Sequence, residues 1–173
     1  MQLHCRHMDI YTALIIAHVI GTALGAGGAT LAEVQINKAL KDGKVDASER
    51  ALMHANYTTI RVGMVLILFS GLALVWWHLG QGNNWVLTSP KIWTKDIMFL
   101  VIIANAFFLT KRWVPLWLGS AISFTSWWGA AVLGIWRTHG ISFPEFLIAY
   151  VAAIFIMAGI LEAIRRYVTA RRR

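Results

Sequence analysis

Six histidines and one cysteine are the residues of this 173-residue chain most suited to binding a metal or a metal-containing cofactor. His18 lies in a long apolar stretch and is followed by Gly21, Gly25 and Gly28, which fall on one helical face. Imidazole is a common axial ligand of haem iron, and glycines let a flat macrocycle approach a backbone. One hypothesis is therefore a haem site at His18. The alternative is close helix packing through the GxxxG motif of Gly21 and Gly25, with His18 hydrogen-bonded to a neighbour.

Helical rise indicates which side chains could meet His18 inside a membrane. At about 1.5 Å per residue, His18 lies about 12 Å below the surface on the N-terminal side. We predict a polar layer at this depth made of Ser70, Asn105, Ser126, Trp127 and Tyr150. His78 lies about 8–10 Å shallower by the same rise, which argues against a haem held by both imidazoles and favours an aromatic belt. The candidate cofactor-binding residues are His18, Gly21, Gly25, His78, Asn105 and Tyr150, with His18 and His78 as candidate metal ligands.

A second group of metal-binding residue types lies at the N-terminus. His4, Cys5, His7 and Met8 are suited to copper(I) or zinc, and His139 is expected on the same side of the membrane. A copper-handling or transport protein is therefore the alternative function, and a flexible tail is the other interpretation of residues 1–7. No GxSxG, HExxH or phosphate-binding glycine motif is present, so the sequence leaves open whether the protein is an enzyme.

The composition predicts that these residues are held by membrane-spanning helices. The chain is 58% hydrophobic and 14% charged, with a mean hydropathy of +0.60, whereas soluble domains carry about 25% charged residues. About 20 apolar residues cross a bilayer. Five stretches qualify, at 9–32, 61–79, 92–110, 116–136 and 143–164. We predict an all-α integral membrane bundle of five transmembrane helices forming one domain, which excludes a large soluble catalytic domain.

The basic residues predict how this bundle is oriented. Five spans put twelve Lys and Arg residues on one side and four on the other, and basic residues near spans stay cytoplasmic. The expected location is therefore the bacterial inner membrane, with a periplasmic N-terminus and a basic cytoplasmic tail at 165–173. No aromatic-basic interleaving points to nucleic acid. The lipid bilayer is the expected partner, and a homo-oligomer or a structural role in a larger membrane complex stays open.

The connection between the first two spans is expected to be a cytoplasmic helical hairpin over residues 33–55. Both helices should extend past the bilayer, the first to about Leu40 and the second from about Ala47. A glycine at position 43 ends the first helix, and Asp46 or Ser48 caps the second. The turn resembles half of a calcium-binding EF-hand loop, but Lys38 and Leu40 replace two carboxylates. We therefore expect no tight calcium binding.

The first and third spans resemble those of a broad group of small bacterial membrane proteins. His18 is followed by Gly27 and Gly28, and residues 95–101 read Lys-Asp-Ile-Met-Phe-Leu-Val. The group includes haem-binding, oxygen-independent protoporphyrinogen oxidases, copper-resistance D-type proteins and uncharacterised relatives. The resemblance implies that His18, and Lys95 or Lys91, are functionally important. It implies a protein that binds haem b and has a redox or electron-transfer role near the periplasmic face.

Overall fold

The described part of the chain folds entirely into helices. The structure is a computed structural model that describes residues 2–137 and 140–170, with the side chains of residues 2–8 and 42 outside that description. Six helices and no strand occur in these ranges: α1 (Gln2–Asp42), α2 (Ala47–Gly80), α3 (Trp85–Thr88), α4 (Pro90–Thr110), α5 (Leu116–Ile135) and α6 (Phe143–Ala170).

All helices except α3 are long and apolar enough to cross a membrane. The five candidate spans are Asp9–Lys41, Ala47–Gly80, Pro90–Thr110, Leu116–Ile135 and Phe143–Ala170. The predicted all-α bundle with five spans is therefore confirmed, and the chain is a multi-pass membrane protein. α1, α2 and α6 run well past the predicted stretches, and α4 begins two residues earlier than predicted. The 34 residues of α2 measure about 50 Å, longer than a hydrocarbon core of about 30 Å.

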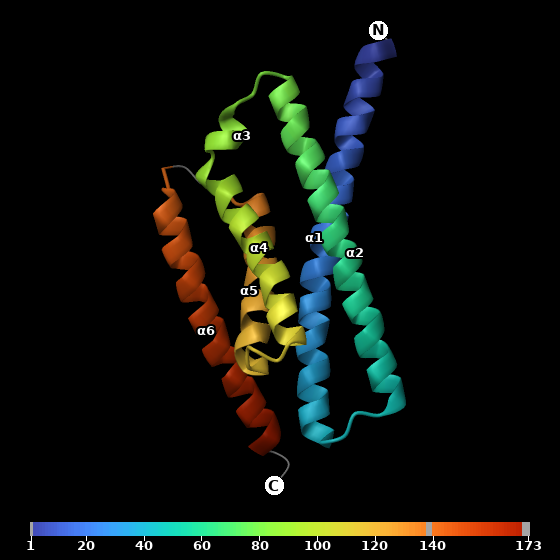
Figure 1. Cartoon of the computed structure of the whole chain (residues 1–173), viewed down its shortest axis with the longest axis vertical. Coiled ribbons are helices and arrows are strands. Elements are labelled where there is room, and N and C mark those ends of the chain that lie inside the picture. Colours follow the sequence, from blue (N-terminus) through green and yellow to red (C-terminus); the bar gives the residue numbers. More distant parts are fainter. Residues whose placement is uncertain (1, 138–139, 171–173) are drawn as a thin grey trace.

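The helices form two groups that α1 joins (Figure 1). One group is the antiparallel pair of α1 and α2, and the other is the trio of α4, α5 and α6. α1 packs against α2 and also against α5 and α6, whereas α2 contacts only α1 and α3 among the described helices. The N-terminus, α3 and the α5–α6 connection share one end of the molecule, which we call the α3 end.

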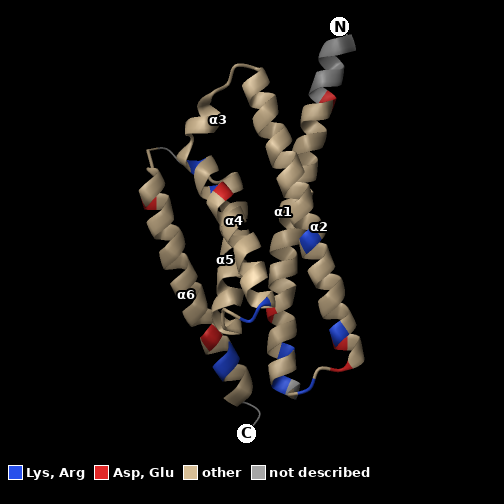
Figure 2. Cartoon of the chain, viewed as in Figure 1, with Lys and Arg blue, Asp and Glu red and all other residues tan. Residues whose placement is uncertain are grey.

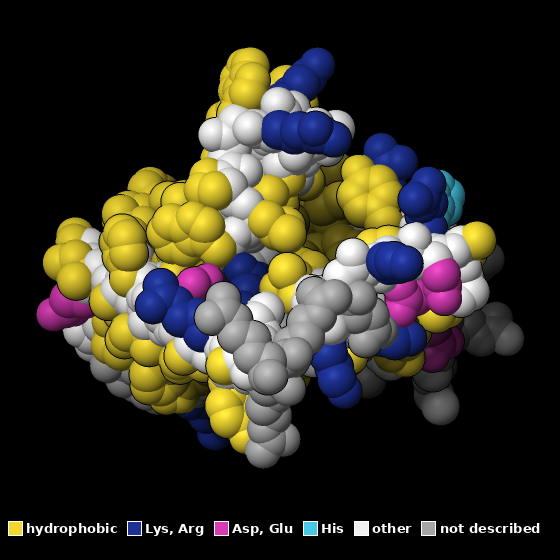
Figure 3. Space-filling model, turned by 90° about the horizontal axis from the view of Figure 1, so that it is seen from below, with side chains coloured by type: hydrophobic (Ala, Val, Ile, Leu, Met, Phe, Trp, Pro, Cys, Tyr) yellow, Lys and Arg dark blue, Asp and Glu magenta, His cyan; other side chains and the backbone are white. Residues whose placement is uncertain are grey.

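The opposite end is rich in Lys and Arg, and we call it the basic end (residues 38–61, 111–115 and 162–170). It carries the α1–α2 turn, the α4–α5 turn and the last turns of α6 (Figure 1). Figure 2 shows most of the Lys and Arg positions towards this end. Seen from below, they surround a surface that also contains many hydrophobic side chains (Figure 3). This mixture is typical of helix ends at a membrane interface.

The α1–α2 turn follows the local signals in the sequence. Gly43 adopts a φ of 67°, the left-handed conformation that favours glycine after a helix. Asp46 then caps α2: its carboxylate accepts from the backbone N–H of Glu49 at 2.6 Å, and Glu49 accepts from the Asp46 N–H at 3.3 Å. These bonds and the Ser48 hydroxyl lower the pKa of Asp46. Glu49 also pairs with Lys38 across the turn at 2.9 Å.

The interior of the helical trio is closed by small and aromatic side chains. Trp127 of α5 is 1% exposed and packs with Ala26 and Ala29 of α1 and Ile102 of α4. Ala121 of α5 meets small and apolar residues of α6 near the basic end. α5 is therefore the helix against which α1, α4 and α6 all pack. This arrangement sets the positions of the polar residues described next.

Candidate functional site

His18 of α1 points towards α2 and forms a hydrogen bond across that helix pair. Its Nδ1 lies 3.0 Å from the hydroxyl oxygen of Ser70. The Ser70 hydroxyl lies 2.5 Å from the backbone carbonyl oxygen of Leu66, one turn earlier in α2. The position of Gly71 leaves room for the ring, since a Cβ there would stand 3.5 Å from His18 Cε1. The prediction that His18 hydrogen-bonds to a neighbour within the membrane is therefore confirmed.

The contacts of Ser70 favour one tautomer of the imidazole. When the Ser70 hydroxyl donates its single proton to the Leu66 carbonyl oxygen, its oxygen accepts from Nδ1 of His18. In this tautomer Nδ1 carries the proton and the lone pair is on Nε2, and the Ile67 backbone carbonyl is a further acceptor beside the ring. Metal-binding histidines are usually held in this way, with one ring N–H donated to a fixed acceptor and the other nitrogen left for the metal.

The two lysines suggested by the resemblance lie on α4, which packs against α3, α5 and α6 and not against α1 or α2 in the described part of the chain. Lys91 places its Nζ 2.7 Å from the backbone carbonyl of Trp136. The side chain of Lys95 is half-buried. The candidate site at His18 therefore lies between α1 and α2, in the half of the molecule nearer the α3 end.

The glycine face of α1 is filled by other helices. A Cβ at Gly25 would lie 1.9 Å from the Trp127 ring of α5. A Cβ at Gly21 would meet the Gly63 carbonyl oxygen of α2 at 3.0 Å, and one at Gly28 would meet Ile60 at 2.5 Å. The packing alternative for the GxxxG motif is thus the one observed. A macrocycle could not lie against these glycines without displacing Trp127 and α2.

His78 lies apart from His18 in an aromatic group at the α3 end. Its ring centroid is 5.9 Å from Tyr11 of α1 and 5.5 Å from Trp85 of α3, both in edge-on geometry. No hydrogen bond joins His78 to His18 or Ser70 in the described part of the chain. His78 therefore lies among aromatic side chains of α1 and α3, as an aromatic belt requires.

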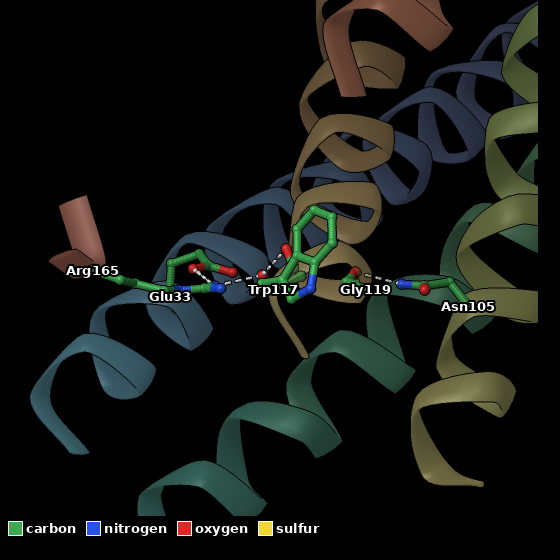
Figure 4. A network of polar contacts seen from close by, with 6 residues as sticks. Glu33, Asn105, Trp117, Gly119 and Arg165 are labelled. Atoms are coloured by element: carbon green, nitrogen blue, oxygen red, sulfur yellow. Dashed lines mark hydrogen bonds and ion pairs between the residues drawn. The ribbon is translucent and has the colours of Figure 1, made fainter. Parts of the chain in front are cut away.

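The predicted polar layer divides into separate pairs. The Tyr150 hydroxyl of α6 bonds to Ser126 of α5 at 2.6 Å, while His18 bonds to Ser70. Asn105 donates to the Gly119 carbonyl oxygen at 2.7 Å, near the start of α5 and the basic end (Figure 4). The expectation that Asn105 shares the depth of His18 is therefore wrong. Asn105 belongs to the last turns of α4, and a rise of about 1.5 Å per residue carries it beyond that level.

The N-terminal copper or zinc candidates lie outside the described residues. The side chains of His4, Cys5, His7 and Met8 are not described, and neither is His139. Elsewhere, within residues 9–137 and 140–170, no group of three or more His, Cys, Asp and Glu side chains is placed to hold a metal ion.

A buried ion pair near the basic end is the polar site that the sequence analysis missed. Nη2 of Arg165 on α6 lies 2.9 Å from a carboxylate oxygen of Glu33 on α1 and 2.6 Å from the Ser120 hydroxyl of α5 (Figure 4). The Arg165 and Glu33 side chains are 9% and 8% exposed. Arg165 Nε is buried and has no partner. Three helices are thus linked through one guanidinium group.

A sequence signal for this pair existed in the helical spacing of α6. Tyr150, Ala158, Leu161 and Arg165 are buried and recur at intervals of helical periodicity. The predicted span ended at 164, so Arg165 was counted with the cytoplasmic tail. Glu33 was similarly placed just after the first span. Extending both helices by one turn would have brought two opposite charges into the bundle.

Comparisons with protein-family models, with characterised proteins and with solved structures found no match to this chain. The chain therefore stands as a multi-pass helical membrane protein, and its function rests on the two polar sites described above.

Proposed function

We propose that this membrane protein binds haem b through His18 and has a redox or electron-transfer role. The observation that supports the proposal is the His18–Ser70–Leu66 hydrogen-bond chain, in which a His18 that donates from Nδ1 to Ser70 has its lone pair on Nε2. A neutral imidazole held in this way is suited to bind iron. Haem bound there would supply one-electron redox chemistry.

The residues around His18 fit such a group on one side only. We assign to Lys95 of α4 the positive charge that would complement the negative propionate groups of haem, because Lys91 is held at the Trp136 carbonyl. The glycine face does not fit, because Trp127 and α2 occupy it. His78 is held among aromatic rings and is not part of the proposed site. The proposed site therefore comprises His18 as the ligand, Ser70 as its orienting partner and Lys95 as the counter-charge.

The proposal includes an orientation in the bilayer. The excess of Lys and Arg residues at one end favours placing the basic end in the cytoplasm of a bacterial inner membrane (Figure 2). His18 and Lys95 then lie in the periplasmic half of the bundle. A redox partner would approach this site from the α3 end.

An absorption spectrum of the purified full-length protein tests the haem proposal. We expect a Soret band in protein produced with added haem precursor, or after hemin addition in detergent. His18→Ala should lose the band or shift it, because the axial ligand is gone. His78→Ala is the matched control, an imidazole in another part of the α3 end, and should leave the spectrum unchanged.

A second pair of variants tests the roles of the surrounding residues. Ser70→Ala should shift the spectrum or weaken haem affinity about 10-fold or more, because the second partner of a ligating histidine is removed. Lys95→Met should weaken haem binding and leave the band position unchanged. A wild-type protein that shows no Soret band after hemin addition would refute the proposed function. An identical loss in the His18 and His78 variants would refute the assigned ligand.

A further inference from the structure

The basic end carries a groove that the proposed haem site does not use. It lies between α1, the start of α5 and the last turns of α6, with a volume of ≈ 350 Å³. Its apolar wall is formed by Ile36, Leu40, Leu116 and Trp117, and Arg165 and Arg166 line it with Glu162. Figure 3 views the molecule from this end.

Arg165 gives the groove a buried donor that is only partly satisfied. Its Nη2 is occupied by Glu33 and Ser120, whereas its Nε has no hydrogen-bond partner. A buried N–H without an acceptor is costly, particularly on a charged group. The ion pair with Glu33 fixes the guanidinium at the wall of the groove. An acceptor oxygen entering the groove would meet a positioned cation.

The start of α5 adds a second attraction for an anion. Leu116 and Trp117 are the first two residues of this 20-residue helix, and both line the groove. Pro115 at the N-cap supplies no side-chain hydrogen bond. The Pro115 carbonyl accepts from the N–H groups of Leu118 and Gly119, so the N–H groups of Leu116 and Trp117 are the ones at the positive end of the helix dipole that an anion could use. Helix starts of this kind bind phosphate groups.

Arg166 completes the polar part of the groove at its exposed edge. Its side chain is 80% exposed, and it pairs with Glu162 one turn earlier at 2.8 Å. An exposed pair of this type is weak and can exchange partners. Arg166 can therefore turn from Glu162 to an anion without disturbing the buried pair of Arg165 and Glu33.

The apolar wall decides which phosphate compound fits. Leu40, Leu116 and Trp117 are each more than one third exposed, so the wall opens onto the outer surface of the bundle. A free phosphate ion would leave this wall in contact with water or lipid. The acyl chains of a phospholipid would cover it, and basic pockets between membrane helices bind anionic headgroups.

We propose that this groove binds an anionic phospholipid, with the phosphate between Arg165, Arg166 and the start of α5 and the acyl chains along Leu40, Leu116 and Trp117. The lipid bridges α1, α5 and α6 at the basic end. This site is separate from His18 and does not depend on haem binding.

Lipid binding to the full-length protein tests the proposal. Native mass spectrometry of the detergent-purified protein would compare phosphatidylglycerol with phosphatidylcholine of the same acyl chains. We expect phosphatidylglycerol to bind more tightly. Arg166→Gln should weaken its binding about fivefold, the effect expected for one basic residue near a lipid surface. Lys111→Gln is the matched control at the same end but outside the groove, and should change binding less than about twofold.

Arg165→Lys separates headgroup binding from the structural ion pair. The lysine keeps a cation opposite Glu33 but lacks the guanidinium donors, so phosphatidylglycerol binding should fall while the helical circular dichroism is retained. If Arg165→Lys fails to fold, the comparison of Arg166→Gln with Lys111→Gln still tests the proposal. Equal binding of the two lipids, or equal losses in Arg166→Gln and Lys111→Gln, would overturn the proposal. Displacement of the lipid by millimolar inorganic phosphate alone would overturn the assignment to a phospholipid.

Discussion

Gly25 shows how one missing side chain determines the contact between α1 and α5. Trp127 occupies the space that a Cβ at position 25 would need, at 1.9 Å. The ring is fully enclosed, so it cannot move aside without losing contacts with Ala26, Ala29 and Ile102. Small residues at such positions allow membrane helices to approach closely.

Gly25→Ala should therefore destabilise the folded bundle by about 1–3 kcal/mol, the usual effect of overpacking a closed interior. Unfolding in mixed detergent micelles would measure the change. Gly27→Ala is the matched control, since nothing lies within 4 Å of a Cβ at that position. A loss of stability at position 27 as large as that at position 25 would contradict the assigned contact.

The ion pair between Glu33 and Arg165 is a second contact between helices that depends on single side chains. Removing one partner leaves the other charge buried without compensation, so Arg165→Met or Glu33→Leu alone should cost about 3–5 kcal/mol. Unfolding in mixed detergent micelles would measure this loss of stability. The double variant Glu33→Leu with Arg165→Met should recover much of this loss, because both charges are then absent. A double variant as unstable as the sum of the two single variants would show that the charges do not interact.

At the scale of elements, the cap of α2 links the hairpin turn to pH. The carboxylate of Asp46 accepts hydrogen bonds from the Glu49 N–H and the Ser48 hydroxyl, which lower its pKa below the ordinary 3.8. A lowered pKa in the folded state means that the ionised group stabilises the turn. This contribution is present above the ordinary pKa and is lost as the pH falls through the lower, folded-state value.

Hydrogen exchange of the backbone amides at 47–50 measures this effect. Their protection factors should stay constant from neutral pH to about 4 and fall below that, as Asp46 takes up a proton. Asp46→Asn keeps an oxygen that can cap the helix and should flatten this part of the profile. Protection that falls equally in the wild type and in Asp46→Asn would assign the pH dependence to another group.

Helix starts are the structural feature that local sequence signals predict well. The start of α2 at about Ala47 was predicted from a capping residue, and α2 begins at Ala47 with Asp46 as its N-cap. The hydrophobic stretch predicted from 116 begins at the first residue of α5. Such signals act within one helical turn, through hydrogen bonds and backbone angles of neighbouring residues. They are therefore readable without knowing the tertiary structure.

At the scale of the whole molecule, the distribution of charge predicts an orientation. Reporters of location inserted in the loop at 81–84 and in the turn at 43–45 should give opposite results. The loop at 81–84, at the α3 end, is expected outside the cytoplasm, and the turn at 43–45, at the basic end, inside it. A reporter after Lys111 should agree with the turn at 43–45. A cytoplasmic signal from the 81–84 loop would reverse the proposed orientation of the His18 site.

The sequence by itself determined the class of the molecule and the positions of its turns. Hydrophobic runs long enough for a bilayer are a property of consecutive residues, and so are the glycine, proline and capping signals between them. The same reasoning identified His18 and Ser70 as members of one polar layer. It could not say which residues of that layer touch.

The polar partners and the packing of the glycine face depend on the tertiary structure. Helical rise gives the depth of a residue along its own helix, whereas the displacement of one helix along the next is set by their packing, and this is why Asn105 does not lie beside His18. Arg165 was placed outside the bundle because the predicted span ended one residue before it, whereas α6 continues to Ala170. The filling of Gly25 by Trp127 depends on how α1 and α5 lie against each other. Contacts of this kind join residues about a hundred positions apart, such as Trp128 with Thr30 and Arg165 with Glu33. No local pattern encodes them, because each depends on the rotation and depth of two separate helices.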